Sequence, residues 1–538
     1  MKKILPLFLG VVVIASLLLL GCDSASTTTT SSSPASTTTT SAQTSTTTPS
    51  TETAKYGGVL KKFASEPYSL GYPASMTGQI DGQTASVCLE PLFLFDKDRN
   101  ITSLLATDYT LDSTAKTLTI VLRENVKFQD GSDFNATVCK WNLDQYRTGA
   151  RPELNAVSSV DVVDDHTVRL NLSTFDNTLL YSLSTAADAG RMISMESFLA
   201  HGTQEEAQAW AEKNPVGTGA WQLSSYTKDV SIIWERFDGY WGGKPYIDEI
   251  QMVRSTDSTV SLMAFKSGEY QIAPSVMGSS DAKSMKEQNT WNMALVSEGQ
   301  VPTLAGAADD PYFSNLKIRQ AMSYAIDVDT MGAGLGQGFW PSLNQWAIEG
   351  TWGYNPNIVG YPYNPEKAKE LLAEAGYPNG FDTTLHFYNL PGPQIDQVTA
   401  VQTYLQAVNI NVTLDPMARP AFAEIASNKK GFTGIVQVQA VAYPDPLVTW
   451  AAIIAGNSFN GILIPQELKD VYAQAIQTTD QETKQQLVWE LNRLASDEYC
   501  VMTFLFNQQV IVFKSKTLHD DGYGEYPYYY LSPKAWLE

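Results

Sequence analysis

Residues 117–131 read Thr-Leu-Thr-Ile-Val-Leu-Arg-Glu-Asn-Val-Lys-Phe-Gln-Asp-Gly and contain the clearest fold signal in the chain. Leu118, Ile120 and Leu122 alternate with their neighbours at the period of a half-buried β-strand. The Asp-Gly pair that ends the stretch is typical of a tight turn. Residues 167–172, Thr-Val-Arg-Leu-Asn-Leu, repeat the alternation and predict a second strand.

Helical patterns lie further along the chain. Residues 318–326 place five apolar side chains on one helical face. Asn364-Pro365 is typical of an N-cap and a first-turn proline, and Gly376 ends the apolar stripe that follows. Residues 487–495 predict another helix. Because strands and helices interleave, the sequence predicts an α/β fold with more than one lobe.

The composition excludes several classes of protein. The chain has 538 residues, of which 43 % are apolar, so large cores and more than one domain are expected. With 57 acidic and 36 basic side chains the formal net charge is −21. Such a chain is a poor partner for nucleic acid, whose phosphates require basic patches. Anionic lipid would also repel it, so attachment to a membrane would require an anchor.

The first 22 residues resemble a bacterial lipoprotein signal. Lys2 and Lys3 precede an apolar stretch, and Leu-Leu-Gly-Cys ends it at Cys22. The resemblance implies that residues 1–21 are removed and that Cys22 is lipidated. Residues 22–55 are rich in Ser and Thr and cannot bury enough apolar surface to fold. We expect a disordered tether that holds the body at the extracytoplasmic face of the cell membrane, periplasmic or at the cell surface.

The chain offers few residues for chemistry. It has neither a Gly-x-Ser-x-Gly motif nor a phosphate-binding loop, and the glycines at 332–338 have the wrong spacing for a nucleotide fingerprint, so a loop is expected there. The four histidines lack metal-ligand spacing. We therefore expect no catalytic residue, metal or cofactor. A paired-acid hydrolase site stays open among so many carboxylates. The histidines are His166, His201, His386 and His519.

Three cysteines lie beyond Cys22, at Cys88, Cys139 and Cys500. An odd number leaves at least one thiol unpaired within the chain. Either two of them form a disulfide, or all three are buried thiols.

Eight short motifs, in order from residue 56 to about 510, resemble the bacterial extracellular solute-binding proteins of family 5. These are the oligopeptide, dipeptide and nickel receptors of ABC importers. The motifs are residues 56–60, 89–93, 122–131, 214–221, 240–245, 318–327, 363–369 and 443–446.

The resemblance implies a two-lobed clamshell of the type II periplasmic-binding-protein class, with three domains as in peptide-binding proteins. Residues 300–306 and 505–510 would form the hinge between the lobes. Domain I would be discontinuous and domain II an insertion into it. The implied boundaries are 56–90, 215–305 and 508–538 for domain I, 91–214 for domain II and 306–507 for domain III.

The implied function is the substrate-binding component of an ABC importer. A monomer would capture a peptide-like or other oligomeric solute by hinge closure and deliver it to permease subunits. A chemosensory receptor on the same fold and a secreted hydrolase are the alternatives. A nickel or haem role also stays open, although few histidines are available for nickel.

Candidate ligand contacts follow from a cleft that needs aromatic walls and a few polar groups. The best is the loop with Tyr443 and Asp445, followed by Trp450; Asp445 alternatively caps the next helix. The others have alternatives in packing or solvation. They are Trp340 and Trp346 in a Gly/Pro-rich loop, Ser65, Glu66 and Tyr68 after the first strand, and Arg419, which is suited to a ligand carboxylate.

One position departs from the family pattern. Three residues before Asp445, where peptide receptors of the family place an acid that binds the peptide's α-ammonium, this chain has Ala442. A buried ammonium without a counter-charge is costly. Either Asp445 replaces the acid, or the ligand lacks the amine. A blocked peptide, an oligosaccharide, an opine-like compound or a chelated metal would fit the second case.

Overall fold

The computed structural model separates the chain into residues 1–53 and a compact body, Ala54–Glu538. The expected signal peptide, Cys22 and almost all of the tether lie outside the described residues. No helix in the described part of the chain is long and apolar enough to span a bilayer. The described residues are 53–76, 79–98, 100–149, 152–274, 277–297, 299–388, 394–428, 431–454, 459–526 and 530–538.

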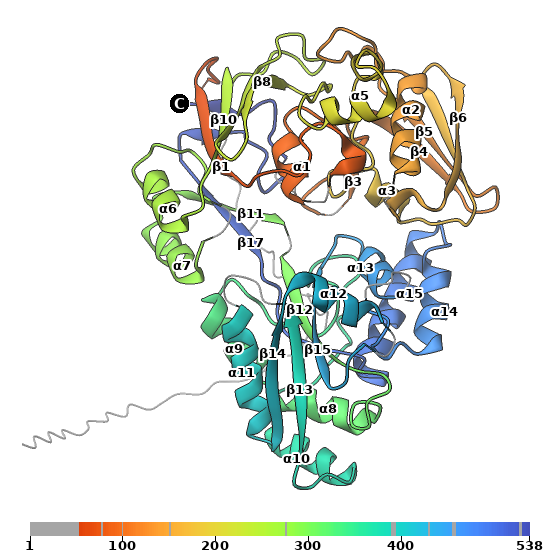
Figure 1. Ribbon diagram of the computed structural model, residues 1–538, viewed down its shortest axis with the longest axis vertical. Helices are drawn as coiled ribbons and strands as arrows, with labels where there is room; N and C mark the ends of the chain where they lie inside the picture. The colour runs from red at the N-terminus through yellow and green to blue at the C-terminus, as the bar shows by residue number, and fades with distance from the viewer. Residues whose placement is uncertain are drawn as a thin grey trace, which may run out of the picture. The chain divides into compact units, whose positions relative to one another are not determined.

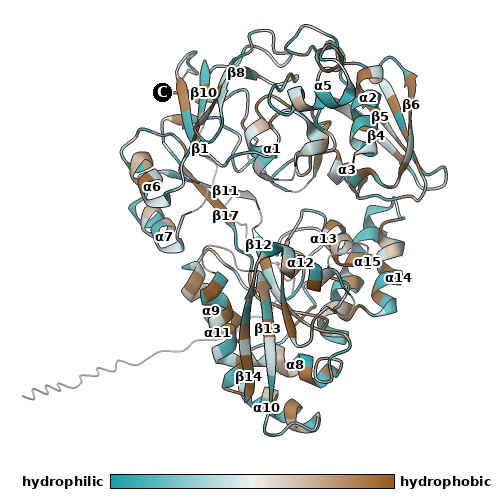
Figure 2. Cartoon of the chain, viewed as in Figure 1, coloured by the Kyte–Doolittle hydropathy of each residue, from teal (hydrophilic) through white to brown (hydrophobic). Residues whose placement is uncertain are grey.

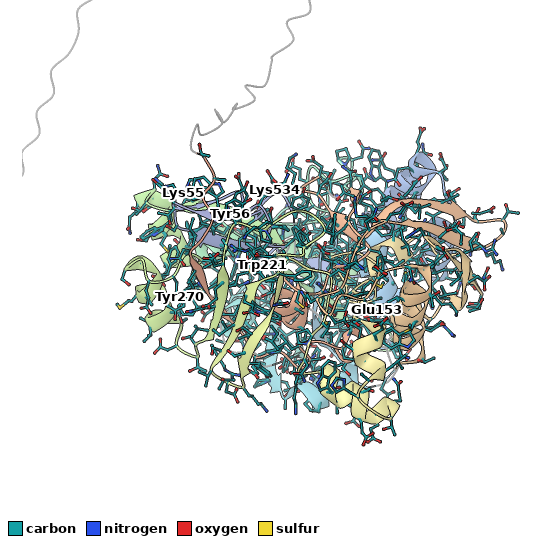
Figure 3. All side chains as sticks on the ribbon, turned by 90° about the horizontal axis from the view of Figure 1, so that it is seen from above. Lys55, Tyr56, Glu153, Trp221, Tyr270 and Lys534 are labelled. Atoms are coloured by element: carbon teal, nitrogen blue, oxygen red, sulfur yellow. The ribbon has the colours of Figure 1, made fainter. Side chains whose placement is uncertain are left out.

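One four-stranded sheet joins the start of the body to residues far along the chain. β1 pairs in parallel with β10, and β8, β9 and β10 form an antiparallel meander. Trp221, labelled in Figure 3, begins β8; it is 1 % exposed and donates from Nε1 to the Ile247 carbonyl at 3.1 Å. The order is β1 (Val59–Ala64), β10 (Glu249–Arg254), β9 (Ser231–Arg236) and β8 (Trp221–Thr227).

Short helices complete this part of the body. Side chains of α1, α4 and α5 share the hydrophobic cluster of the sheet, whereas α6 and α7 pack in another cluster with β17 (Val510–Lys514). The helices are α1 (Gln79–Ala85), α4 (Met195–Leu199), α5 (Gln204–Ala211), α6 (Ser258–Lys266) and α7 (Ser279–Gln288). Two short strands, β18 (Leu518–His519) and β19 (Trp536–Leu537), pair antiparallel near the end of the chain.

A second four-stranded sheet contains both strands expected from alternation. β5 (Thr117–Leu122) and β7 (Thr167–Leu172) have the expected bounds, and Ile120 lies opposite Val168 in their antiparallel register. The apolar face of β5 is buried against α2 (Ala136–Thr148). The sheet is completed by β4 (Ala106–Asp112) and β6 (Val157–Asp164). A separate two-stranded sheet is formed by β2 (Phe93–Phe95) and β3 (Ile101–Ser103), and α3 is Leu179–Ser182.

A five-stranded sheet organises residues 300–507 (Figure 1). β13 is parallel to β14 and β15, and β12 runs antiparallel between β15 and the edge strand β16. Helices α8, α10 and α11 cover one face, and α13, α14 and α15 cover the other. The strands are β14 (Ile410–Met417), β13 (Phe381–Tyr388), β15 (Ile435–Val441), β12 (Gln300–Gly306) and β16 (Thr503–Phe504).

The helices predicted in this region are confirmed. Asn364 accepts a hydrogen bond from the Lys367 N–H at the start of α10, and Gly376 follows its end with φ +93°. The bounds are α8 (Leu316–Ala325), α10 (Pro365–Glu374), α11 (Gln394–Gln406), α12 (Arg419–Ser427), α13 (Pro446–Ile454), α14 (Gln466–Ala475) and α15 (Gln481–Arg493), which a π-helical turn at Leu494–Glu498 extends.

The prediction of a loop at residues 332–338 is wrong for most of this segment. Gly332, Gly334 and Gly336 lie in helix α9 (Val328–Gly336). Asp327 caps this helix by accepting from the Thr330 N–H, and burial of apolar side chains along it offsets the poor helix propensity of glycine.

Two strands carry the chain into and out of the five-stranded sheet. β11 (Asn292–Ser297) leads into β12, and β17 (Val510–Lys514) follows β16. The two strands β11 and β17 pair antiparallel. β17 is largely hydrophobic (Figure 2). At the crossing, the Gly299 N–H donates to Asn507 Oδ1 at 3.2 Å and the Gln508 N–H donates to the Gln300 carbonyl at 2.9 Å. The two crossing segments are therefore hydrogen-bonded directly to each other.

The three cysteines of the body are free, buried thiols. The disulfide alternative is therefore wrong in this structure. Burial raises the pKa of Cys88 to about 12 and the pKa of Cys139 further.

Glu90 is a buried carboxyl in the segment between α1 and β2. It is 2 % exposed and accepts hydrogen bonds from Thr218 Oγ1 (2.8 Å), Tyr240 Oη (2.7 Å) and Trp241 Nε1 (2.8 Å). Burial dominates over these donors and raises the pKa of Glu90 to about 7.

The Gly299→Ala variant tests the crossing. An added Cβ would lie 1.2 Å from the Gln508 carbonyl oxygen, so the backbone must move. We expect the free energy of unfolding to fall by about 3 kcal/mol. Urea denaturation followed by tryptophan fluorescence measures this. Gly334→Ala is the control, because its Cβ would meet no atom within 4 Å in a helix and should stabilise the protein by about 0.5–1 kcal/mol. A urea midpoint of Gly299→Ala equal to that of the wild type would contradict the tight crossing.

Glu90 should make stability depend on pH. Between pH 4.5 and 7 the folded protein holds the Glu90 proton and the unfolded chain has released it, so stability falls as pH rises. The free energy of unfolding is expected to fall by about 3 kcal/mol, because each unit of pKa shift corresponds to about 1.4 kcal/mol. Denaturation at several pH values should show it in the wild type and in exposed Glu525→Gln, but not in Glu90→Gln. A Glu90→Gln variant with the wild-type slope would refute this assignment.

Candidate functional site

The carboxyl ends of β13, β14 and β15 meet at one edge of the five-stranded sheet, because the three strands run in the same direction. Helices α11, α12 and α13 begin shortly after these ends. A helix N-terminus offers unpaired N–H groups and the positive end of the helix dipole. Open α/β sheets bind ligands at such an edge. We refer to it as the carboxyl edge.

The loop that leaves β15 at the carboxyl edge contains Tyr443 and Asp445. The Tyr443 ring lies 5.1 Å from the ring of Tyr181 at 66°, and burial raises the pKa of Tyr443. Asp445 Oδ1 accepts from the Leu447 N–H at 3.0 Å, at the start of α13. The capping alternative for Asp445 is therefore confirmed.

The other oxygen of Asp445 is bound to a lysine. Lys484 Nζ, from α15, donates to Asp445 Oδ2 at 2.5 Å, and the two side chains are 11 % and 13 % exposed. The same ammonium lies 5.3 Å from the centre of the Trp352 ring. Both oxygens of Asp445 therefore have partners inside the protein, and its charge is balanced.

Trp346, Trp450 and Ala442 lie in one hydrophobic cluster and are almost completely buried. Trp450 Nε1 donates to Asn492 Oδ1 at 3.1 Å, and Trp346 packs edge-on against Phe504. These positions suit packing, and ligand contact through either tryptophan stays a prediction.

The other predicted contacts lie apart from this loop. Trp340 stacks on Phe506 with ring centres 5.2 Å apart. Arg419 is exposed at the first residue of α12 and so lies at the carboxyl edge. Its position fits the predicted contact with a carboxylate, which stays a prediction.

Ser65, Glu66 and Tyr68 follow β1, on a different sheet. Ser65 is exposed and Tyr68 is 73 % exposed. Glu66 accepts from Tyr226 Oη at 2.5 Å and from the Asp229 N–H at 3.0 Å. The carboxylate of Glu66 is therefore occupied within its own sheet, whereas the Tyr68 ring is open to a ligand.

Three buried glutamines near the carboxyl edge were not predicted. Gln394 Nε2 donates to Gln437 Oε1 at 2.7 Å. Gln437 Nε2 and Gln397 Oε1 have no hydrogen-bond partner among the described residues, although both side chains are 1 % exposed. Unpaired buried amides are unfavourable. Glutamines inside the apolar strand Ile-Val-Gln-Val-Gln-Ala-Val were the available signal.

A cavity of about 380 Å³ lies elsewhere, beside the edge strand β16. Its walls come only from residues 323–363 and 496–504, and they contain Asp327, Asp329 and Glu349 but no basic side chain. In the described part of the chain, no group of three His, Cys, Asp or Glu side chains is placed to hold a metal ion.

The Lys484→Met variant tests the ion pair. It would leave Asp445 almost buried without a counter-charge, so we expect the free energy of unfolding to fall by about 3 kcal/mol. Denaturation in urea measures the change. The double variant Asp445→Asn/Lys484→Met should recover part of the loss, because the charge of Asp445 is then removed together with its partner. Lys469→Met, at an exposed position on α14, is the matched control with a change below about 0.5 kcal/mol. A Lys484→Met protein as stable as this control would count against the pair.

Comparison with known proteins agrees with the motifs. The model of the bacterial extracellular solute-binding proteins, family 5 Middle, matches residues 100–460. The glutathione-binding protein GsiB of Pectobacterium atrosepticum is 30 % identical over 374 residues, which cover 67 % of this chain and 68 % of that protein. GsiB of Salmonella typhi is 32 % identical over 303 residues, covering 55 % of this chain but only 57 % of the relative's length.

A solved structure confirms the α/β periplasmic-binding-protein fold. DppA of Helicobacter pylori, an ABC transporter-associated periplasmic binding protein in complex with the peptide STSA, superposes with a TM-score of 0.73 at 22 % identity, covering 90 % of this chain and 99 % of DppA. The resemblance read from the eight motifs is confirmed. The chain belongs to the bacterial extracellular solute-binding proteins of family 5.

Proposed function

We propose that this protein is the substrate-binding component of an ABC importer, which captures a peptide-like or other oligomeric solute by hinge closure and passes it to permease subunits. The observation that carries the proposal is the carboxyl edge of β13, β14 and β15, with three helix N-termini, in a chain of this family. Relatives named for binding glutathione and a structure with a bound peptide support the peptide-like class. Capture and delivery need no catalytic residue.

The hydrophobic clusters support the proposed division into three domains. One cluster combines residues 60–89, 193–294 and 512–535; it joins the three segments of the proposed domain I and also includes residues 193–211 of the proposed domain II. A second lies within 92–192, and two more lie within 301–506. The crossing at Gly299 and Gln508 connects these regions and is the proposed hinge.

The charges around Asp445 support a ligand without a free ammonium at this position. Asp445 is balanced by Lys484, and Ala442 is 1 % exposed in the core. A ligand ammonium would therefore lose water without gaining a free carboxylate from this loop. Arg419 and the helix N-termini instead favour a neutral or anionic group. We propose a peptide-like solute with a blocked amine.

The proposed location follows from the family and from the sequence of the N-terminus. Members of this family are extracellular binding proteins. A lipid on Cys22 and the Ser/Thr-rich residues up to 55 would tether the monomeric body to the outer face of the cell membrane.

A peptide mixture tests both the function and the ligand class. Protein stripped of solute is incubated with equimolar di- to pentapeptides, each present with a free amine and with an N-acetyl group. Native mass spectrometry then identifies the retained species. We expect the acetylated form to be enriched at least tenfold, because a buried ammonium would lack a counter-charge.

The outcomes separate the two parts of the proposal. Retention of free-amine peptides at an equal or higher level would overturn the ligand class and leave the binding function intact. Retention of no peptide, including the acetylated ones, would overturn the peptide-like function itself. Solute released from protein purified from its own cells provides an independent comparison.

A further inference from the structure

Asn177 connects two parts of the body that are distant in sequence. It lies between β7 and α3 and is 6 % exposed. Its backbone N–H donates to the Ile476 carbonyl at 2.9 Å. Its side-chain Nδ2 donates to the carbonyls of Ala475 and Thr478, both at 2.8 Å and 298 and 301 positions away. One residue thus makes three hydrogen bonds between residues 91–214 and residues 306–507.

The acceptors explain why an amide is suited to this position. Ala475 and Ile476 end helix α14, and the last carbonyls of a helix have no partner within it. They also carry the negative end of the helix dipole, which favours a donor. Asp176 holds the turn by accepting from the N–H of Thr178 (2.8 Å) and from its hydroxyl (2.7 Å). Asn177 therefore caps α14 from a remote part of the chain.

An aromatic contact lies in the same part of the body. The rings of Tyr181, on α3, and Tyr443, in the loop after β15, are 5.1 Å apart. Phe95 and Val448 belong to the same hydrophobic cluster. Polar contacts thus hold residues 91–214 against the end of α14, and apolar contacts hold them against the loop of the candidate site. We call Asn177 and Tyr181, with their partners, the clasp.

We propose that Asn177 is a positioning residue for solute capture, and that the clasp holds residues 91–214 on residues 306–507 when the protein is closed. Movement apart at this contact must break the three hydrogen bonds and free the last carbonyls of α14. Asn177 would therefore set the ratio of closed to open protein without touching the solute. Apparent affinity then changes with that ratio. This inference relies on the hinge closure proposed above.

Distance measurements test the clasp without any ligand. Spin labels are placed at Val163→Cys, a half-exposed position on β6, and at Lys469→Cys on α14, in a Cys22→Ser background whose remaining cysteines are buried. Pulsed dipolar spectroscopy gives the distribution of label distances. Asn177→Ala removes two of the three bonds, and Asn177→Asp keeps the shape but turns a carboxylate toward carbonyl oxygens.

A matched control comes from the neighbouring strand. Asn171, on β7, donates to Ser159 Oγ (3.0 Å) and Asp161 Oδ2 (2.8 Å) within its own sheet. Asn171→Ala should therefore leave the distances unchanged. For both Asn177 variants we expect the long-distance population to grow at least tenfold relative to the short one, and apparent affinity for any retained solute to fall in proportion to the remaining closed fraction. Thermal melting shows that each variant is folded.

Distances that match the wild type in Asn177→Asp and Asn177→Ala would overturn the clasp. So would an equal shift in Asn171→Ala, because the effect would then be unspecific. Neither result would affect the proposed binding function, since no solute is present in the distance measurement. Conversely, failure of the peptide experiment would leave a measured clasp in place.

Discussion

The close contact between Gly299 and the Gln508 carbonyl constrains how the two sides of the crossing are arranged. No side chain fits at Gly299, so the strand entering the five-stranded sheet and the strand leaving it lie directly against each other. The next residue, Gln300, pairs with Val441 at the end of β15. The crossing and the carboxyl edge therefore share one hydrogen-bond ladder. This ladder therefore connects the crossing to the loop that contains Tyr443.

In this acidic chain, the charges of two enclosed carboxyl groups are balanced or suppressed. The net charge is −21, yet Asp445, which is largely enclosed, has a lysine partner, and burial favours the protonated form of Glu90. Surface carboxylates face water, where repulsion is screened. Because the loop at the carboxyl edge has its charge already balanced, its contribution to recognition would come from shape, aromatic rings and hydrogen bonds.

Local patterns predicted much of the fold. The alternation in β5 and β7 and the cap and proline of α10 depend on neighbouring residues, and the structure has them where they were expected. The glycine spacing led to a wrong prediction of a loop at α9. The cap at Asp327 and the burial of an apolar face outweigh the weak helix propensity of glycine. The candidate site was harder to predict. Spacing alone does not reveal that Trp346 lies inside a core.

Contacts between distant residues account for the rest of what the sequence did not reveal. The partner of Asp445 lies on another helix, and the partners of Asn177 lie about 300 positions away. Nothing in the local sequence distinguishes Asn177 from other asparagines, because its function depends on where α14 ends. The buried glutamine of β15, Gln437, gave a signal, a polar residue in an apolar strand, but its partner Gln394 comes from α11.

The three enclosed thiols have a consequence for export. A thiol reacts with oxidants as thiolate, and burial raises the pKa of Cys88, Cys139 and Cys500 far above neutral pH. In the oxidising space outside the cell membrane, the folded body would therefore keep its sulfur atoms reduced. Its maturation would need no disulfide-forming enzyme, and reducing agents would leave the finished protein unchanged.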